Sequence, residues 1–168
     1  MAKYCLDTSG LSNPAMEMPE TIYVSLWAQV TSLIHDEIFC WNVEIAEELS
    51  SIYGAAGQAL MACNGSCCLE VGVGDWPWPE YIELVNEWSN KYNAYISEYN
   101  GGRKNTIGLN DLSIVALAKT LGLPVVSMER QNFGPPSTTK LRIPDLCLIE
   151  GVKHYSFNEF LQNEGVKV

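Results

Sequence analysis

Lys3–Tyr4–Cys5–Leu6–Asp7–Thr8–Ser9 is a short apolar run that ends in a carboxylate and two hydroxyls. Such a run predicts a buried strand over residues 3–7. In an open α/β sheet, ligands bind beyond the carboxyl ends of the strands, so Asp7 would lie where chemistry takes place. A second interpretation is equally open from this stretch alone, because Asp7 is also suited to cap the next helix or to start a turn.

The rest of the chain alternates between helical spacing of apolar residues and short apolar runs. This alternation predicts an α/β fold with a mainly parallel sheet. The expected elements, after a break at Asn13–Pro14, are a helix over 20–35, a strand over 37–41, helices over 43–53 and 80–98, a helix from Leu109 that ends at Gly122, a strand over 124–127, a loop over 130–141, a helix from Pro144, a strand over 152–155 and a helix over 157–163.

Length and composition predict one globular domain, residues 1–168, with 47% hydrophobic residues. We expect a cytoplasmic protein with reduced cysteines and no membrane span, because no signal-peptide or spanning pattern is visible. The formal net charge of −10 disfavours direct binding to phosphates unless metal ions or a local basic patch neutralise them. Arg103–Lys104 is the one basic pair expected near a candidate acid.

Residues 63–79 are expected to form an insertion rich in Cys and Trp. The spacing of Cys63, Cys67 and Cys68 does not match a zinc site, and no histidine lies nearby. Gly72 and the glycine two residues later lack the rest of a dinucleotide-binding fingerprint, which predicts a loop. We expect Trp76 and Trp78 to pack this loop against the domain, with base stacking as the weaker alternative.

Four acids occupy positions that an open parallel sheet would bring together. Asp7 follows the first strand, Glu48 lies in the helix after the second strand, Asp111 opens a later helix, and Glu129 follows a later strand. Mg²⁺ prefers oxygen ligands, and clustered carboxylates can hold one or two ions for phosphoryl displacement. Without a cation the carboxylates would repel one another and raise some of their pKa values, and this cost favours a functional role.

These acids lie in motifs that together resemble a PIN domain, the metal-dependent ribonuclease fold that includes VapC-type toxins. The tail Ile143–Pro144–Asp145–Leu146–Cys147 also resembles that of one branch of PIN-like proteins. The other matching segments are Tyr4–Cys5–Leu6–Asp7–Thr8–Ser9, Glu48–Leu49, Asn110–Asp111–Leu112–Ser113–Ile114–Val115–Ala116–Leu117–Ala118 and Val125–Val126–Ser127–Met128–Glu129.

The resemblance implies a three-layer α/β/α sandwich that hydrolyses RNA with a Mg²⁺- or Mn²⁺-activated water. Asp7 and Asp111 would hold the ion, and Glu48 and Glu129 would complete its shell. Ser9, Asn110 and Ser127 would orient metal or phosphate. The implied role is the toxin of a type II toxin–antitoxin pair, a homodimer that meets a basic antitoxin. His35 and His154 are then structural.

Three points stay open at the level of sequence. Glu44 or Glu47 would replace Glu48 if the helix phase differs, and all three also fit a solvated helix face. A haloacid-dehalogenase-like phosphatase is disfavoured, because it needs a second Asp where this chain has Ser9. A PIN-shaped binding module without activity is the main alternative. Asp145 is expected to cap its own helix.

Overall fold

The computed structural model describes residues 1–102, 106–131 and 140–167. Over these residues the chain forms one sheet with strand order β3-β2-β1-β4-β5, in which every neighbouring pair is parallel. The strands are β1 (Tyr4–Leu6), β2 (Phe39–Asn42), β3 (Cys68–Leu69), β4 (Val125–Val126) and β5 (His154–Tyr155). The fold is therefore α/β, as predicted.

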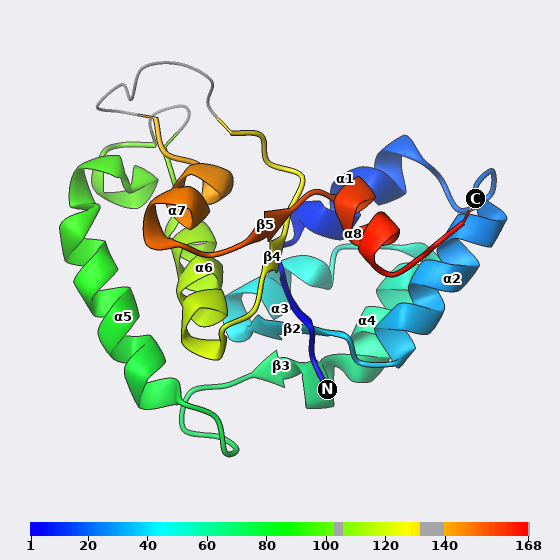
Figure 1. Ribbon diagram of the computed structural model, residues 1–168, viewed down its shortest axis with the longest axis horizontal. Helices are drawn as coiled ribbons and strands as arrows, with labels where there is room; N and C mark the ends of the chain where they lie inside the picture. The colour runs from blue at the N-terminus through cyan, green and yellow to red at the C-terminus, as the bar shows by residue number, and fades with distance from the viewer. Residues whose placement is uncertain (103–105, 132–139, 168) are drawn as a thin grey trace.

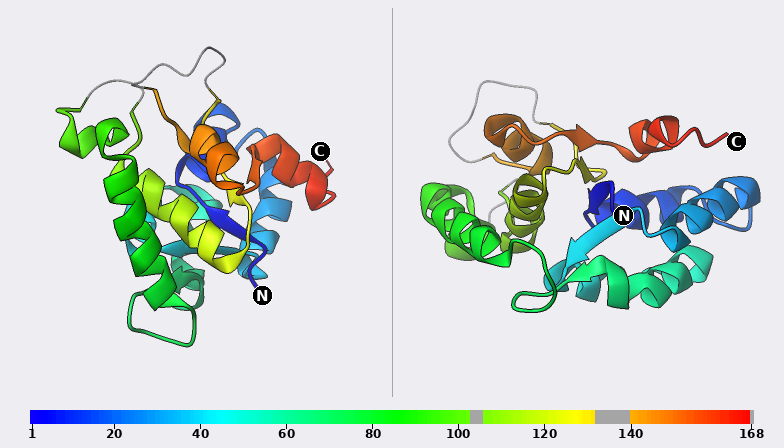
Figure 2. Two further views of the ribbon diagram at one scale, coloured as in Figure 1. Left: turned by 60° about the vertical axis from the view of Figure 1, so that its left-hand side comes forward. Right: turned by 60° about the horizontal axis from the view of Figure 1, so that its bottom comes forward.

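Helices cover both faces of the sheet, which gives the three α/β/α layers (Figures 1 and 2). The helices α1, α2, α4 and α8 lie on one face and α5, α6 and α7 on the other, while α3 lies at the end of β2. Their bounds are α1 (Ser9–Glu17), α2 (Val24–His35), α3 (Val43–Leu49), α4 (Gly54–Cys67), α5 (Trp78–Lys91), α6 (Leu109–Leu121), α7 (Ile143–Glu150) and α8 (Phe157–Asn163). None of these helices is long and apolar enough to span a bilayer.

The register of the sheet aligns the carboxyl ends of its central strands. Leu6 of β1 pairs with Val126 of β4, so the residues after them, Asp7 and Ser127, leave the sheet at the same level. All residues of β1, β2 and β4 are buried, as expected for parallel strands between two helical layers. The carboxyl edge is therefore a shared exit for segments far apart in sequence.

Several predicted elements are confirmed. The helix predicted from residue 43 does begin there, and Asn42 caps it by accepting a hydrogen bond from the Ile45 N–H at 3.2 Å. Gly122 ends α6 in the left-handed conformation, with φ of 67°, which glycine adopts without steric cost. The final helix has the predicted bounds, 157–163. Arg103–Lys104 and most of the expected loop over 130–141 lie outside the described residues.

The Cys- and Trp-rich segment over 63–79 begins with regular secondary structure. Cys63 and Cys67 lie in α4 and are buried, and Cys68 begins the edge strand β3, so this part belongs to the core. Only the segment after β3 is a loop. Its Trp76 donates the indole N–H to the carbonyls of Glu70 and Val73, both at 3.1 Å, as a packing residue would.

Four predicted helix boundaries are wrong. The helix expected over 20–35 starts only at Val24. The chain does not break at Asn13–Pro14, because α1 continues through Pro14 to Glu17. The helix expected over 43–53 ends at Leu49, and the next one starts at Gly54. The helix expected over 80–98 ends at Lys91 and is followed by two 3₁₀ turns, Asn93–Tyr95 and Ser97–Tyr99.

Candidate functional site

Asp7 lies directly after β1 and is held in place by its neighbours. Its side chain is buried, at 4% exposure. Oδ2 accepts the Ser9 N–H at 3.1 Å and the Ser9 hydroxyl at 2.5 Å. The Ser9 Oγ accepts the N–H of Met128 at 3.0 Å, which ties the end of β1 to the segment after β4. Asp7 therefore does start the turn into α1, as one interpretation expected, and it also faces the predicted site.

Asp111 reaches the same region from the first turn of α6. Its Oδ2 accepts the N–H of Gly108 at 3.1 Å, a local bond that satisfies one free donor at the start of the helix. The side chain is partly buried. Asp111 thus fixes the N-terminus of α6 through one oxygen.

The charges of the four predicted acids act on one another. Burial raises the pKa of Asp7 to about 6; the bonds from Ser9 oppose this rise, and the charges of Glu129 and Glu48 add to it. Burial raises the pKa of Asp111 to about 7, and the charges of Asp7, Glu129 and Glu48 contribute. The carboxylates are therefore close enough to repel one another, as expected for a cluster.

Glu48 is the glutamate of α3 that faces this cluster. Its Oε2 accepts the Thr8 hydroxyl at 2.7 Å and its Oε1 accepts the Asn110 amide at 2.8 Å. Thr8 follows Asp7 and Asn110 precedes Asp111, so Glu48 links the two segments that carry the buried acids. The charge of Glu44 acts instead on Tyr81 and Cys68. The orientation of α3 thus favours Glu48 over Glu44 and Glu47 as the glutamate of the predicted site.

Glu129 is partly engaged with the neighbouring helix. Its Oε2 accepts the N–H of Ile143 at 2.8 Å, at the start of α7. Asp145 caps the same helix, as expected, by accepting the N–H of Arg142 at 3.0 Å. Glu129 therefore holds α7 against the end of β4 while its charge acts on the buried aspartates.

Ser127 directly follows β4, and its side chain is turned into the interior of the protein. It is fully buried, its Oγ lies 2.7 Å from Nε2 of His154, and it accepts the N–H of Glu129 at 3.3 Å. Its hydroxyl thus fixes the strand end that carries Glu129, and this geometry differs from the predicted contact with metal or phosphate. The contact with Ser127 is consistent with a structural role for His154, which stays a prediction.

Each buried aspartate keeps one oxygen available. Within the described part of the chain, Oδ1 of Asp7 and Oδ1 of Asp111 accept no hydrogen bond, and the ion pairs are Lys3–Glu164 and Lys91–Glu150, both away from the site. Among the described residues, Thr31 Oγ1 is the buried side-chain nitrogen or oxygen that has no hydrogen-bond partner. The two Oδ1 atoms also have no partner but do not count as buried, so both are accessible to solvent.

The donor set fits a hard divalent cation, although no ligand shell is already assembled. No three His, Cys, Asp or Glu side chains of residues 1–102, 106–131 and 140–167 are arranged as a metal site. Mg²⁺ takes one or two carboxylates and keeps several waters, which suits the two free oxygens of Asp7 and Asp111. Both oxygens of Glu48 and one oxygen of Glu129 already accept hydrogen bonds from protein groups.

A fifth acid, Glu98, was not predicted for this region. Both of its oxygens accept the N–H of Leu109 at 3.1 Å, so it caps α6 from the preceding 3₁₀ turn. A Cβ placed on Gly108 would lie 3.3 Å from Asp111 and 3.5 Å from Glu98, so both carboxylates flank this glycine. No signal in the sequence predicts this contact, because it depends on where α5 ends.

Comparison with known proteins places the whole chain in one family. No curated protein matches it with significant sequence similarity. One family, described as a domain of unknown function (DUF4411), matches residues 4–168. Since the match covers nearly every residue, the chain belongs to the DUF4411 family.

Proposed function

We propose that this protein is a Mg²⁺- or Mn²⁺-dependent nuclease that hydrolyses phosphodiester bonds in RNA. The observation that carries the proposal is the pair Asp7 and Asp111, a buried and a partly buried carboxyl group without a cationic partner among the described residues. Burying such charges is costly unless they are paired or bind a metal. The resemblance of the surrounding motifs to PIN domains supports RNA as the substrate.

Each proposed ligand is oriented by its own set of bonds. The N–H and the hydroxyl of Ser9 both bond to Oδ2 of Asp7, which leaves Oδ1 for a ligand. The Gly108 N–H does the same for Asp111. A bound divalent ion would lower the pKa of a coordinated water and polarise a phosphoryl oxygen. Glu48 and Glu129 would accept hydrogen bonds from water at the site and so orient it.

The test is RNA cleavage during Mn²⁺ and Mg²⁺ titration, with a panel of structured RNAs. We expect Asp7→Asn and Asp111→Asn to lose about 100-fold or more in kcat, because each removes a ligand charge. Asp75→Asn changes an exposed acid in the loop after β3 and is expected to cleave like the wild type. Equal cleavage by wild type and Asp7→Asn, or cleavage that persists in EDTA, would show that the proposal is wrong.

A toxin role belongs to the same proposal. Excess negative charge on the protein would suit a basic antitoxin segment by electrostatic complementarity, and the protein would act as a cytoplasmic homodimer. Expression of the wild type is then expected to arrest bacterial growth, while Asp7→Asn is tolerated. Growth arrest by both proteins would indicate toxicity unrelated to cleavage.

The second candidate is a PIN-shaped RNA-binding module without catalysis. It is favoured by the lack of an assembled group of three metal-binding side chains among the described residues. This candidate predicts RNA binding that is the same for the wild type and Asp7→Asn, with no cleavage at any Mn²⁺ concentration. A gel-shift assay run beside the cleavage assay therefore separates the two candidates.

A further inference from the structure

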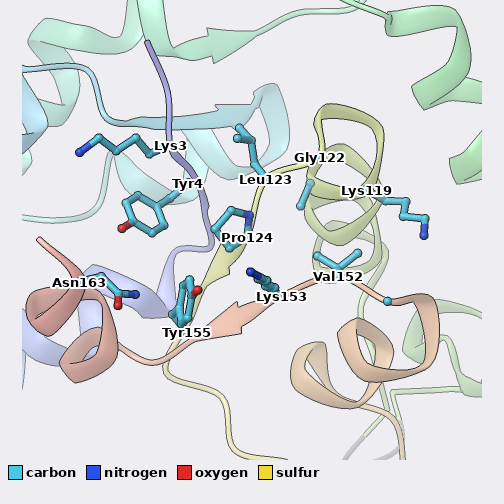
Figure 3. Close-up of a pocket in the computed structure, with 12 residues that line it drawn as sticks. Lys3, Tyr4, Lys119, Gly122, Leu123, Pro124, Val152, Lys153, Tyr155 and Asn163 are labelled. Atoms are coloured by element: carbon cyan, nitrogen blue, oxygen red, sulfur yellow. The ribbon is translucent and has the colours of Figure 1, made fainter.

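A cavity of about 550 Å³ lies at the amino edge of the sheet, opposite the acid cluster. We call it the amino-edge pocket. Its lining comes from β1 and β5, from the residues before β1, β4 and β5, and from the ends of α6 and α8, and it includes Lys3, Lys119, Pro124, Lys153 and Tyr155 (Figure 3). Its volume lies within the range of sites for small organic ligands.

Positive charge is concentrated around this pocket. The chain has seven lysines and a formal net charge of −10, yet three of the seven lysines line one cavity. Such local concentration of one sign is unusual in an acidic protein and attracts anions. The chemistry of the pocket is therefore opposite to that of the carboxyl edge.

The three lysines differ in how their charge is used. Lys3 is ion-paired with Glu164 at 2.9 Å. Lys119 donates to the carbonyl of Glu150 at 2.7 Å, and its charge also acts on the Glu150 carboxylate, whose pKa it helps to lower. The carbonyl of Lys153 accepts the N–H of Val125 at 2.8 Å, but its ammonium makes no hydrogen bond or ion pair with any residue that the structure describes. Figure 3 shows its side chain beside Pro124, between Tyr155 and Val152. Lys153 is thus the cation free to bind a ligand.

One side of the pocket is apolar and aromatic. Leu123, Pro124 and Val152 line it together with the rings of Tyr4 and Tyr155, whose centroids are 6.2 Å apart in an edge-to-face arrangement. Aromatic and proline surfaces of this kind pack against a flat ring. The hydroxyl of Tyr4 is bound to Glu164 at 2.7 Å, which keeps that ring in place.

We propose that the amino-edge pocket binds a small organic anion of the nucleoside monophosphate class. Lys153 would bind the phosphate, since lysine is a common phosphate ligand. The base would lie against Pro124 and Tyr155. An inorganic anion alone would leave the apolar side of the cavity unused. This site is separate from the acid cluster and does not depend on its proposed chemistry.

Isothermal titration calorimetry at low salt, in EDTA, tests the proposal with AMP, GMP, CMP and UMP. Adenosine and inorganic phosphate are the two comparison ligands. We expect at least one nucleotide to bind more tightly than either, in the wild type and in Asp7→Asn alike. Lys153→Met, which keeps the apolar stem, should weaken binding about tenfold or more, because it removes a charged hydrogen-bond donor. Lys153→Arg should restore most of it.

Lys167→Ala is the matched control, because Lys167 is exposed and lies outside the pocket lining. It is expected to bind like the wild type. No nucleotide binding at millimolar concentration, equal binding by Lys153→Met, or phosphate binding as tight as nucleotide binding would each overturn the proposal. Binding that is lost in Asp7→Asn would also overturn it, since the ligand would then occupy the acid cluster.

A second measurement uses the wild type alone. Gly122 and Gly151 line the pocket, so their amide signals in a nitrogen–proton correlation spectrum should shift when nucleotide is added. Gly65, in α4 on the other face of the sheet, should not shift. Shifts absent at both pocket glycines would contradict the proposal even if a lysine variant failed to fold.

Discussion

The Asp7 carboxylate is subject to opposing effects from its surroundings. Burial and the charges of Glu129 and Glu48 disfavour its ionised form, while the two bonds from Ser9 favour it. The net result is a pKa of about 6, above the usual value of 3.8, and Asp111 is raised further, to about 7. Both aspartates are therefore more acidic in the unfolded chain than in the folded protein.

This difference predicts how stability depends on pH in metal-free buffer. Between about pH 4 and pH 7 the folded protein holds protons that the unfolded chain has lost, so the free energy of unfolding should fall as pH rises through this window. Asp7→Asn removes one repelled charge. At pH 8 it should raise the free energy of unfolding by about 1–3 kcal/mol, measured by urea unfolding.

At pH 4 the same variant should have little effect, because the Asp7 carboxyl is protonated in the folded protein. Asp75→Asn provides the control and should leave the pH profile unchanged. If Asp7→Asn lowers the urea midpoint of unfolding at pH 8, then the hydrogen bonds from Ser9 to the carboxylate stabilise the fold more than the repulsion from Glu129 and Glu48 destabilises it. Asp7 would in that case be a structural cap.

The contacts of Glu48 make a second prediction at this scale. Glu48→Gln keeps the length of the side chain but removes its charge from the cluster, so we expect kcat for RNA cleavage to fall by about tenfold or more. Glu47 lies one position earlier in α3 and is exposed. Glu47→Gln should cleave at the wild-type rate. A fall in kcat for Glu47→Gln but not for Glu48→Gln would show that α3 presents Glu47 to the substrate instead.

The acids themselves could be predicted from the sequence, but most of their partners could not. Asp7 and Asp111 stand at the start of helices, a position that the local sequence reveals. The bonds from Thr8 and Asn110 to Glu48 join residues 40 and 62 positions apart. Only the packing of three elements sets such contacts, so the choice among three glutamates stayed open until the structure was known.

At the level of elements, α1 packs unusually close to β4. A Cβ on Gly10 would lie 2.7 Å from the carbonyl oxygen of Val126, so this approach requires glycine. Gly10→Ala should lower the free energy of unfolding by about 1–3 kcal/mol, as overpacking does. RNA cleavage should fall as well, because the added methyl group would displace the neighbouring Ser9, which holds the Asp7 carboxylate in place.

Gly65→Ala is the matched control for this prediction. Gly65 lies in α4 with open space where the Cβ would be, so alanine should stabilise the helix by about 0.5–1 kcal/mol. Urea unfolding of the two variants under the same conditions gives both values. A Gly10→Ala protein as stable as the wild type would mean that α1 moves away from β4 without cost.

The sequence does not predict an element when its apolar pattern is weak or short, or when packing outweighs the local signal. Within α4 the buried positions include small residues, Ala56, Gly57 and Ala59, which give weak apolar periodicity. β3 is two residues long, too short for a pattern. Pro14 suggested a break, but it is buried within α1, where packing outweighs the lost hydrogen bond. In contrast, α6 is buried over Leu112–Ala118, and its apolar run was unmistakable.

The whole molecule separates charge across its sheet. Acids gather beyond the carboxyl ends of β1 and β4, while three lysines surround the amino-edge pocket. The strands between them are only two or three residues long, so both regions rest on the same short scaffold. The net charge of −10 therefore does not exclude anionic ligands, because binding depends on the local field at each edge.

This arrangement predicts that divalent cations stabilise the entire fold. An ion that binds only the folded state adds RT ln(1 + [L]/Kd) to the free energy of unfolding, about 2.7 kcal/mol at 100 times Kd. For a domain of this size that corresponds to a rise in melting temperature of about 5–10 °C. Calorimetry at pH 8 with MgCl₂ or MnCl₂ should show this rise for the wild type but not for Asp7→Asn/Asp111→Asn. Because NaCl at equal ionic strength screens repulsion without binding, it should give a much smaller rise, and an equal effect of both salts would mean that the aspartates bind no specific ion.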